Sequence, residues 1–155
     1  MNKQAVKRIL NKAHDMCVHS GNRLTEKRKR ILELLVTSKI PLSAYEVASA
    51  YNETADAAMP AMSVYRILEF LESEQLVHKL TSANKYVACS HITCDHRHEV
   101  PQFLICGNCQ SVKEIAITKS IIDDLDLQVK KAGYKLMNSQ LELDCLCDDC
   151  VSKAA

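Results

Sequence analysis

The first eighty residues repeat one pattern, in which apolar side chains recur every three or four positions between short polar breaks. That spacing places them on one face of a helix, and it predicts a first helix over residues 4–19. Thr25 precedes a second apolar series and is expected to cap a helix that runs to about Ser38. Pro41 interrupts the chain, and Ser43 is expected to cap a third helix.

A fourth helix is predicted over residues 63–74, with Ser63 as its cap or in its first turn. Its apolar residues follow the i, i+3, i+4, i+7 rule, and they are Val64, Ile67, Leu68 and Leu71. Two short β-like runs follow at 76–80 and 85–89, joined by a polar turn. Three helices, a fourth with one apolar face and a hairpin behind it are the order of elements in a winged helix-turn-helix.

The pattern changes near residue 90. Strand-like runs at 100–106 and 111–117 flank a turn, and a helix with one apolar face is predicted over residues 119–132. Gly133 is placed to end that helix, and residues 134–146 are predicted to form a third strand. A unit of roughly 65 residues buries little apolar surface, so a metal ion or a dimer partner is expected to stabilise it. The predicted fold class is α+β.

Composition and cysteine content change this picture. The chain has 155 residues, of which 47% are hydrophobic and 25% charged, as is typical of globular proteins. No apolar run approaches the length of a membrane span, and the N-terminus lacks the apolar segment of a signal peptide. The protein is therefore expected in the cytoplasm, where thiols stay reduced. Eight cysteines, seven of them after residue 88, then indicate metal binding or redox chemistry.

Two Cys-x-x-Cys motifs occur in the second half, Cys106 to Cys109 and Cys147 to Cys150. Each offers two thiolates on one tight turn, and two such turns complete a closed tetrahedral zinc site with a structural role. The alternative is a redox pair, which needs a Cys-x-x-Cys motif at the start of a helix. Strand-like residues follow Cys109, so the pattern favours structural zinc and leaves Cys145 as a bystander.

A second group of ligand-type residues lies where the two halves of the chain meet. His78 falls on the first strand of the hairpin, Cys89 ends the second, the histidine-rich segment SHITCDHRHEV spans 90–100, and Glu114 follows. Taken singly, each is better explained as an exposed strand or linker residue. Taken together, they favour a mixed nitrogen, sulfur and oxygen site that would join the two domains and fix their relative angle.

Six segments resemble the ferric uptake regulator (Fur) family of metal-sensing repressors, in family order and over nearly the whole chain. They are RLTEKRKRIL (23–32), SAYEV (43–47), SVYRILEFLESEQLVHKL (63–80), YVAC (86–89), FLICGNCQSVKE (103–114) and LCDDC (146–150). Within that family the chain is most similar to the zinc uptake regulators, because Cys89 supplies a soft thiolate that favours zinc. Iron and manganese sensors of the family use sites rich in His, Asp and Glu instead.

The resemblance implies two zinc ions, Zn(2+), per chain. The structural zinc is implied to be bound by Cys106, Cys109, Cys147 and Cys150. The regulatory zinc is implied to be bound by His78, Cys89, His98 and Glu114, with His96 or His91 as alternatives to His98.

The resemblance also implies that helix 63–74 enters the major groove of DNA. Tyr65 and Arg66 lie opposite its apolar stripe, and an arginine can pair with guanine through two hydrogen bonds. Residues 1–80 carry twelve Lys and Arg against nine Asp and Glu, so a mild basic excess lies in this half. The implied DNA-binding residues are Tyr45, Ser63, Tyr65, Arg66, Lys27 and Arg28.

The expected organisation is a winged-helix DNA-binding domain at 1–88, a short hinge at about 84–95, and an α+β dimerisation and zinc-binding domain at 96–155. The expected function is a zinc-responsive transcriptional repressor of zinc uptake genes, and not an enzyme. Zinc at the hinge is expected to favour a homodimer that binds a palindromic double-stranded operator. The alternatives are a Fur-family sensor of iron, manganese or peroxide, and a thiol-disulfide oxidoreductase.

Overall fold

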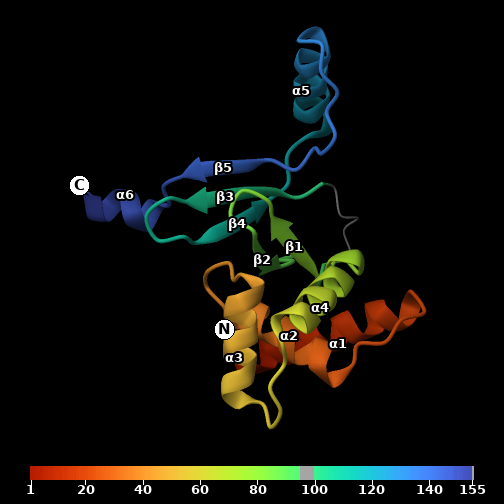
Figure 1. The fold of residues 1–155 in the computed structure, drawn as a ribbon. Helices are drawn as coiled ribbons and strands as arrows, with labels where there is room; N and C mark the ends of the chain where they lie inside the picture. Colours follow the sequence, from red (N-terminus) through yellow and green to blue (C-terminus); the bar gives the residue numbers. More distant parts are fainter. Residues whose placement is uncertain (95–99, 155) are drawn as a thin grey trace. The chain divides into compact units, whose positions relative to one another are not determined.

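The computed structural model describes residues 1–94 and 100–154, and its contacts divide the chain into two compact units, Met1–His96 and Arg97–Ala155. The first unit contains four helices and a hairpin (Figure 1). They are α1 (Lys3–His19), α2 (Glu26–Thr37), α3 (Ala44–Thr54), α4 (Ala61–Ser73), β1 (Val77–Leu80) and β2 (Lys85–Ala88). The predicted α+β class, with helices followed by a hairpin, is confirmed.

Side-chain caps mark where three of these helices begin, at Asn2, Thr25 and Ser43. The Thr25 hydroxyl accepts a hydrogen bond from the Arg28 amide (3.4 Å), which satisfies a free N–H group at the start of α2. At α3 the Glu46 amide donates to the Ser43 hydroxyl (3.2 Å), and the Ser43 amide donates to the Glu46 carboxylate (2.6 Å). This capping box holds the first turn of α3 in place.

The core of the first unit lies between the helices and the hairpin. From α4 it takes Val64, Leu68 and Leu71, all with no exposed area, as the apolar spacing predicts. Helix α2 packs against α1, α3, α4 and β2, and it contributes Ile31 and Leu32. None of the helices in the described ranges has the length and hydropathy that crossing a membrane requires.

The second unit is a three-stranded sheet with two helices. Its elements are β3 (Gln102–Cys106), β4 (Val112–Ile115), α5 (Lys119–Lys131), β5 (Glu142–Cys145) and α6 (Asp148–Ala154). The strand order is β4-β3-β5, with β3 antiparallel to β4 and parallel to β5 (Figure 1). A parallel pair needs a long crossover connection, and the segment that contains α5 provides it.

The predicted strand at 134–146 is wrong in length, because only Glu142–Cys145 is a strand. The side chain of Gln102 explains the difference. Its amide nitrogen donates to the Ser139 carbonyl (2.9 Å), and its amide oxygen accepts from the Leu141 backbone. Side-chain hydrogen bonds thus satisfy the Ser139 carbonyl and the Leu141 amide, and the strand begins only at Glu142.

Candidate metal centres and nucleic-acid interface

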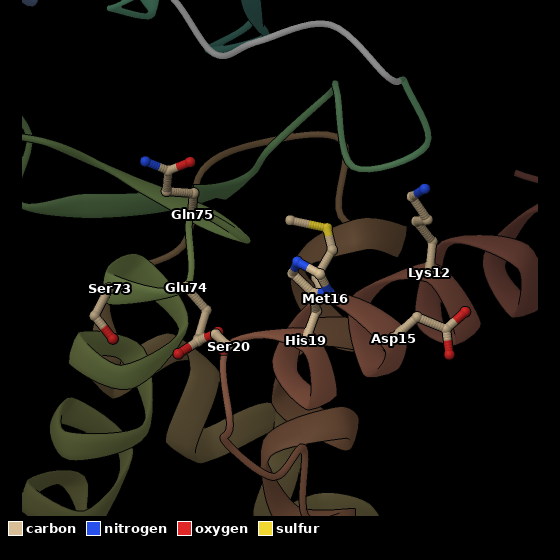
Figure 2. Close-up of a pocket in the computed structure, with 8 residues that line it drawn as sticks. All are labelled: Lys12, Asp15, Met16, His19, Ser20, Ser73, Glu74 and Gln75. Carbon is tan, nitrogen blue, oxygen red and sulfur yellow. The ribbon is translucent and has the colours of Figure 1, made fainter.

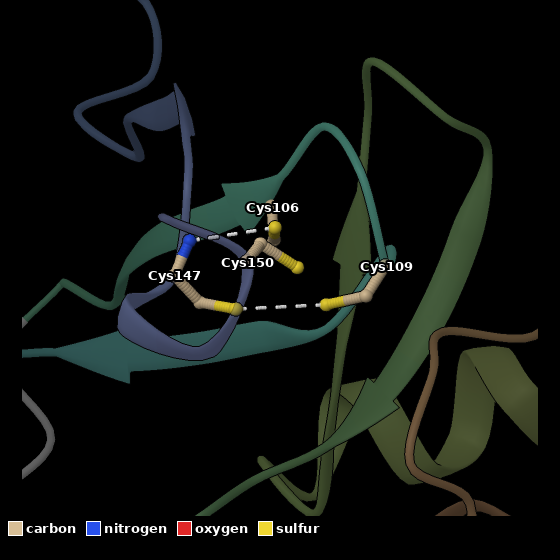
Figure 3. A group of neighbouring side chains, drawn as sticks. All are labelled: Cys106, Cys109, Cys147 and Cys150. Carbon is tan, nitrogen blue, oxygen red and sulfur yellow. Dashed lines mark hydrogen bonds between the residues drawn. The ribbon is translucent and has the colours of Figure 1, made fainter. Parts of the chain in front are cut away.

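The four cysteines of the two Cys-x-x-Cys motifs come together at one end of the second unit's sheet (Figure 3). Their sulfur atoms all lie within 4.8 Å of one another. Cys106 ends β3, Cys109 lies in the turn to β4, and the other two lie after β5, at the start of α6. The Sγ atoms of Cys109 and Cys147 are 3.7 Å apart.

These distances fit a tetrahedral metal ion. Zinc binds thiolates at about 2.3 Å, which places the sulfur atoms of a regular tetrahedron about 3.8 Å apart. The donor set is four soft sulfurs with no oxygen or nitrogen, which suits zinc and leaves no position open for a substrate. The residues present therefore fit a closed, structural zinc site.

The chain around the first motif forms a turn, and backbone amides donate hydrogen bonds to the Cys106 sulfur. Gln110 has a positive φ of 62°, and its amide donates to the Cys106 carbonyl (3.0 Å). The Cys147 amide donates to the Cys106 sulfur (3.4 Å), so a backbone group of one motif contacts a thiol of the other (Figure 3). Such hydrogen bonds stabilise negative charge on the sulfur.

Backbone hydrogen bonds lower the pKa of the Cys106 thiol to about 6, with Cys109 as the largest cause, followed by Cys147 and Asn108. At neutral pH this thiol is therefore mostly thiolate, the form that binds metal. Hydrogen bonds from the side chain and backbone of Ser111 likewise lower the pKa of Cys109. The fold thus prepares part of the site for a cation.

Cys145 lies beside this cluster but outside it. It is the register partner of Cys106 across the parallel strands, and its carbonyl accepts a hydrogen bond from the Gly107 amide (2.9 Å). The group of four mutually close thiols excludes it. Its observed contact is thus made through the backbone, which suits a bystander.

In the first unit the structure brings His78 and Cys89 together. His78 lies on β1 opposite Val87, and Cys89 follows β2 directly. The Cys89 amide donates to the Leu76 carbonyl (2.9 Å), which holds the cysteine against the hairpin. A ring nitrogen of His78 and the Cys89 sulfur lie within 4.8 Å, a distance that one bound cation can bridge.

The other predicted ligands of this second site are spread along the chain. His91 lies in the turn after Cys89, and its amide donates to the Cys89 sulfur (3.4 Å). Glu114 belongs to the second unit, where it lies on β4 opposite Phe103. His96 and His98 lie outside the described residues.

Helix α4 presents a polar face opposite its buried stripe. Arg66 is exposed, Tyr65 is half-buried, and Ser63 lies in the first turn, where its amide donates to the Pro60 carbonyl (3.0 Å). The rings of Tyr65 and Tyr45 meet edge to face, with centroids 6.2 Å apart. Tyr45 is 68% exposed at the start of α3. The predicted α3 and α4 residues therefore share one surface of the first unit.

The two predicted residues of α2 differ from each other. Lys27 is exposed, whereas Arg28 is half-buried and already has partners. Its guanidinium lies 3.5 Å from the centre of the Phe70 ring and donates to the Arg23 carbonyl (2.6 Å). These contacts favour a role for Arg28 in holding the start of α2 against α4.

The ends of α1 and α4 frame a hollow of about 550 Å³ (Figure 2). Glu74 in its wall accepts hydrogen bonds from the Ser20 hydroxyl (2.5 Å) and the Asn22 amide (2.6 Å). This carboxylate therefore clips the turn after α1 to the end of α4. The hollow holds none of the clusters of three or more close ligand groups found among the described residues, and its side chains fix the fold.

Two residues near the start of α4 were not singled out by the sequence pattern. Asn52 is bonded twice to the backbone of Met59, donating to its carbonyl (3.2 Å) and accepting from its amide (2.7 Å). Met62 is 66% exposed in the first turn of the helix. The sequence could have pointed to Met62, because it is an apolar residue outside the apolar stripe of the predicted helix. The role of Asn52 could not be found in this way, because it depends on the conformation of the loop.

Comparison with known proteins gives one consistent result. The ferric uptake regulator family matches residues 19–144. A zinc uptake regulation protein of Escherichia coli (strain K12) is 32% identical over 155 residues, covering 100% of this chain and 88% of that protein.

Two solved structures are similar over most of their length. A zinc uptake regulator complexed with zinc and DNA has a TM-score of 0.81 at 29% identity, covering 97% of this chain and 98% of that one. The crystal structure of holo XcZur has a TM-score of 0.75 at 32% identity, covering 92% and 96%. Because the family match covers most of the sequence and a relative above 30% identity spans all of it, the chain belongs to the ferric uptake regulator family.

Proposed function

We propose that this protein is a zinc-responsive, DNA-binding transcriptional repressor that controls zinc uptake genes. The observation that carries the proposal is its similarity, over nearly the whole chain, to a zinc uptake regulator complexed with zinc and DNA. Members of this family regulate transcription and are not enzymes. We infer a cytoplasmic location from the similarity to zinc uptake regulation proteins.

Two zinc ions per chain are proposed, with different roles. Cys106, Cys109, Cys147 and Cys150 would hold the structural ion, and the thiol geometry and the low pKa of Cys106 support this assignment. The regulatory ion is assigned to His78, Cys89, Glu114 and His98, with His96 or His91 in place of His98. The short His78–Cys89 distance supports the first two of these ligands.

DNA would be bound by the first unit, as a winged-helix domain, through α4. Arg66 is exposed on that helix and can pair with guanine, while Tyr65, Ser63 and Tyr45 border it. Lys27 would contact phosphate. Arg28 is retained among the proposed DNA-binding residues, although its bond to the Arg23 carbonyl supports a positioning role.

The second unit would form the homodimer, which in turn would read a palindromic operator. Helix α5 supports this, because it has apolar residues at helical spacing and yet none of its side chains is buried in a single chain. Ile121 is 51% exposed, and Ile122, Leu125 and Val129 on the same face are only half-buried. An amphipathic helix with an uncovered apolar face needs a partner, and a second copy of the chain supplies a symmetric one.

Replacing Leu125, in the middle of α5, by glutamate is expected to convert the dimer to monomers. An unpaired carboxylate in an apolar interface costs on the order of 3 kcal/mol or more, which weakens association at least about 100-fold. Sedimentation velocity of the zinc-loaded protein measures this. Leu127→Glu makes the same substitution on the opposite face of α5, where the side chain is 49% exposed, and should stay dimeric. A dimeric Leu125→Glu variant would contradict the α5 interface.

Zinc would act by favouring one arrangement of the dimer. The regulatory ligands come from both units, so an ion that binds all of them stabilises the arrangement in which the ligands converge. If that arrangement also matches the spacing of the operator half-sites, zinc and DNA strengthen each other's binding equally. Repression then rises with zinc.

A metal titration of operator binding tests the proposed function. The operator is selected from a random-sequence duplex pool with zinc-loaded protein, and its affinity is measured against free Zn²⁺, Fe²⁺ and Mn²⁺. Zinc is expected to raise the affinity at the lowest free concentration, because thiolate ligands prefer it. Activation by iron or manganese instead, or loss of binding only with peroxide, would assign the protein to another sensor class of its family.

A further inference from the structure

We propose that Met62 reads the 5-methyl group of a thymine in the operator, and so determines sequence specificity beside Arg66. The inference rests on the proposed DNA-binding function. Met62 is the second residue of α4, and 66% of its side chain is exposed. In helix-turn-helix proteins the N-terminal residues of the recognition helix contact base edges in the major groove.

Met62 faces the same way as Arg66. The buried residues of α4 are Val64, Leu68 and Leu71, so positions 62, 66 and 69 form the opposite stripe. All three are exposed in the structure. Met62 therefore shares its surface with the arginine proposed to bind guanine and contributes nothing to the core.

The start of α4 is held in place. Asn52 bonds both backbone groups of Met59 (2.7 and 3.2 Å), three residues before Met62, and fixes the loop that leads into the helix. Pro60 is the N-cap, and its ring restricts the backbone there. A base contact by Met62 would thus need little ordering of the main chain, which favours specificity.

The chemistry of Met62 selects one feature of DNA. A thioether side chain makes apolar contacts, donates no hydrogen bond and accepts one only weakly, so it discriminates poorly among the donors and acceptors of the base edges. The apolar group in the major groove is the thymine methyl. Met62 lies four residues before Arg66, about 6 Å along the helix axis, or roughly two base pairs. The thymine is therefore expected within about two base pairs of the guanine bound by Arg66.

Replacing thymine by deoxyuridine tests this, because it removes only the methyl group. Each thymine in one half-site of the selected operator is replaced singly, and affinity for zinc-loaded protein is measured. One position should lose about fourfold, the value of one buried methyl group. Met62→Ala should bind the unmodified operator less tightly and show no further loss at that position. Met62→Leu should keep the discrimination.

Two controls make the result specific. Val18→Ala removes another exposed apolar side chain of the first unit, 59% exposed on α1, and should change neither affinity nor discrimination. The guanine bound by Arg66 is located by 7-deazaguanine substitution, whose effect Arg66→Ala should abolish. A thymine effect that persists in Met62→Ala, or that lies far from this guanine, would overturn the inference, as would equal affinity for every deoxyuridine operator. A wild-type protein that binds no operator with zinc would overturn the proposed function itself.

Discussion

Replacing Cys106 by serine is expected to unfold the second unit and to remove one zinc ion per chain. Among its described residues this unit buries only Gln102, Phe103, Cys106 and Cys150, so its apolar core is very small. Structural zinc contributes about 10–16 kcal/mol of apparent binding energy in small domains, which is comparable with the whole stability of a typical protein. A serine hydroxyl is a far weaker zinc ligand than a thiolate.

Zinc content and amide hydrogen exchange measure this outcome. Exchange should become fast throughout β3, β4 and β5 of the variant, while the first unit keeps its protection. Cys145→Ser is the matched control, because Cys145 is the register partner of Cys106 and lies outside the group of four thiols. It should retain both zinc ions and the fold. A folded Cys106→Ser protein with two zinc ions would contradict the four-thiolate site.

Replacing Cys89 by serine is expected to remove the other zinc ion and the zinc dependence of operator binding, while the fold survives. Cys89 is buried at the end of the hairpin, and serine is close in size. Coupling between two ligands is typically 1–3 kcal/mol, so operator affinity at saturating zinc should fall by roughly 5- to 150-fold. Zinc per chain should fall from two to one.

The measurement pairs metal content with an operator titration in buffered zinc. Cys94→Ser is the control, since Cys94 is a partly exposed thiol of the same segment and lies outside the close ligand groups of the described residues. It should keep both ions and normal zinc dependence. If Cys89→Ser retained two zinc ions and a normal titration, the assignment of the regulatory site would be wrong.

Much of the fold could be predicted from the sequence, because local rules determined it. The caps Thr25 and Ser43 and the stripe that includes Val64 and Leu68 gave the helices of the first unit within about two residues. The third strand of the second unit could not be predicted correctly, because its length depends on the tertiary hydrogen bonds of Gln102.

In the candidate sites, too, local motifs could be predicted from the sequence and tertiary contacts could not. Paired motifs indicated four cysteine ligands, and the distances among their sulfurs fit that prediction. The position of Cys145 follows from the register between β3 and β5, which cannot be deduced from the spacing of cysteines along the chain. The resemblance implied that Arg28 binds DNA, but its contacts with Phe70 and Arg23 became visible only in three dimensions. The histidine ligand of the regulatory site stays a prediction.

The hydrogen bond between Cys147 and Cys106 joins positions 41 residues apart, and α5 lies in the loop between these two residues. A cross-link over such a loop lowers the entropy of the unfolded chain by an amount worth about 4 kcal/mol in the chain-entropy model. A metal ion at the four thiols would supply that cross-link reversibly. Removing the ion by chelation would free both ends of this loop at once. The sheet would lose its cross-link, and α5 would no longer be held at either end of its segment. Assembly of the proposed dimer would thereby depend on the availability of the metal ion.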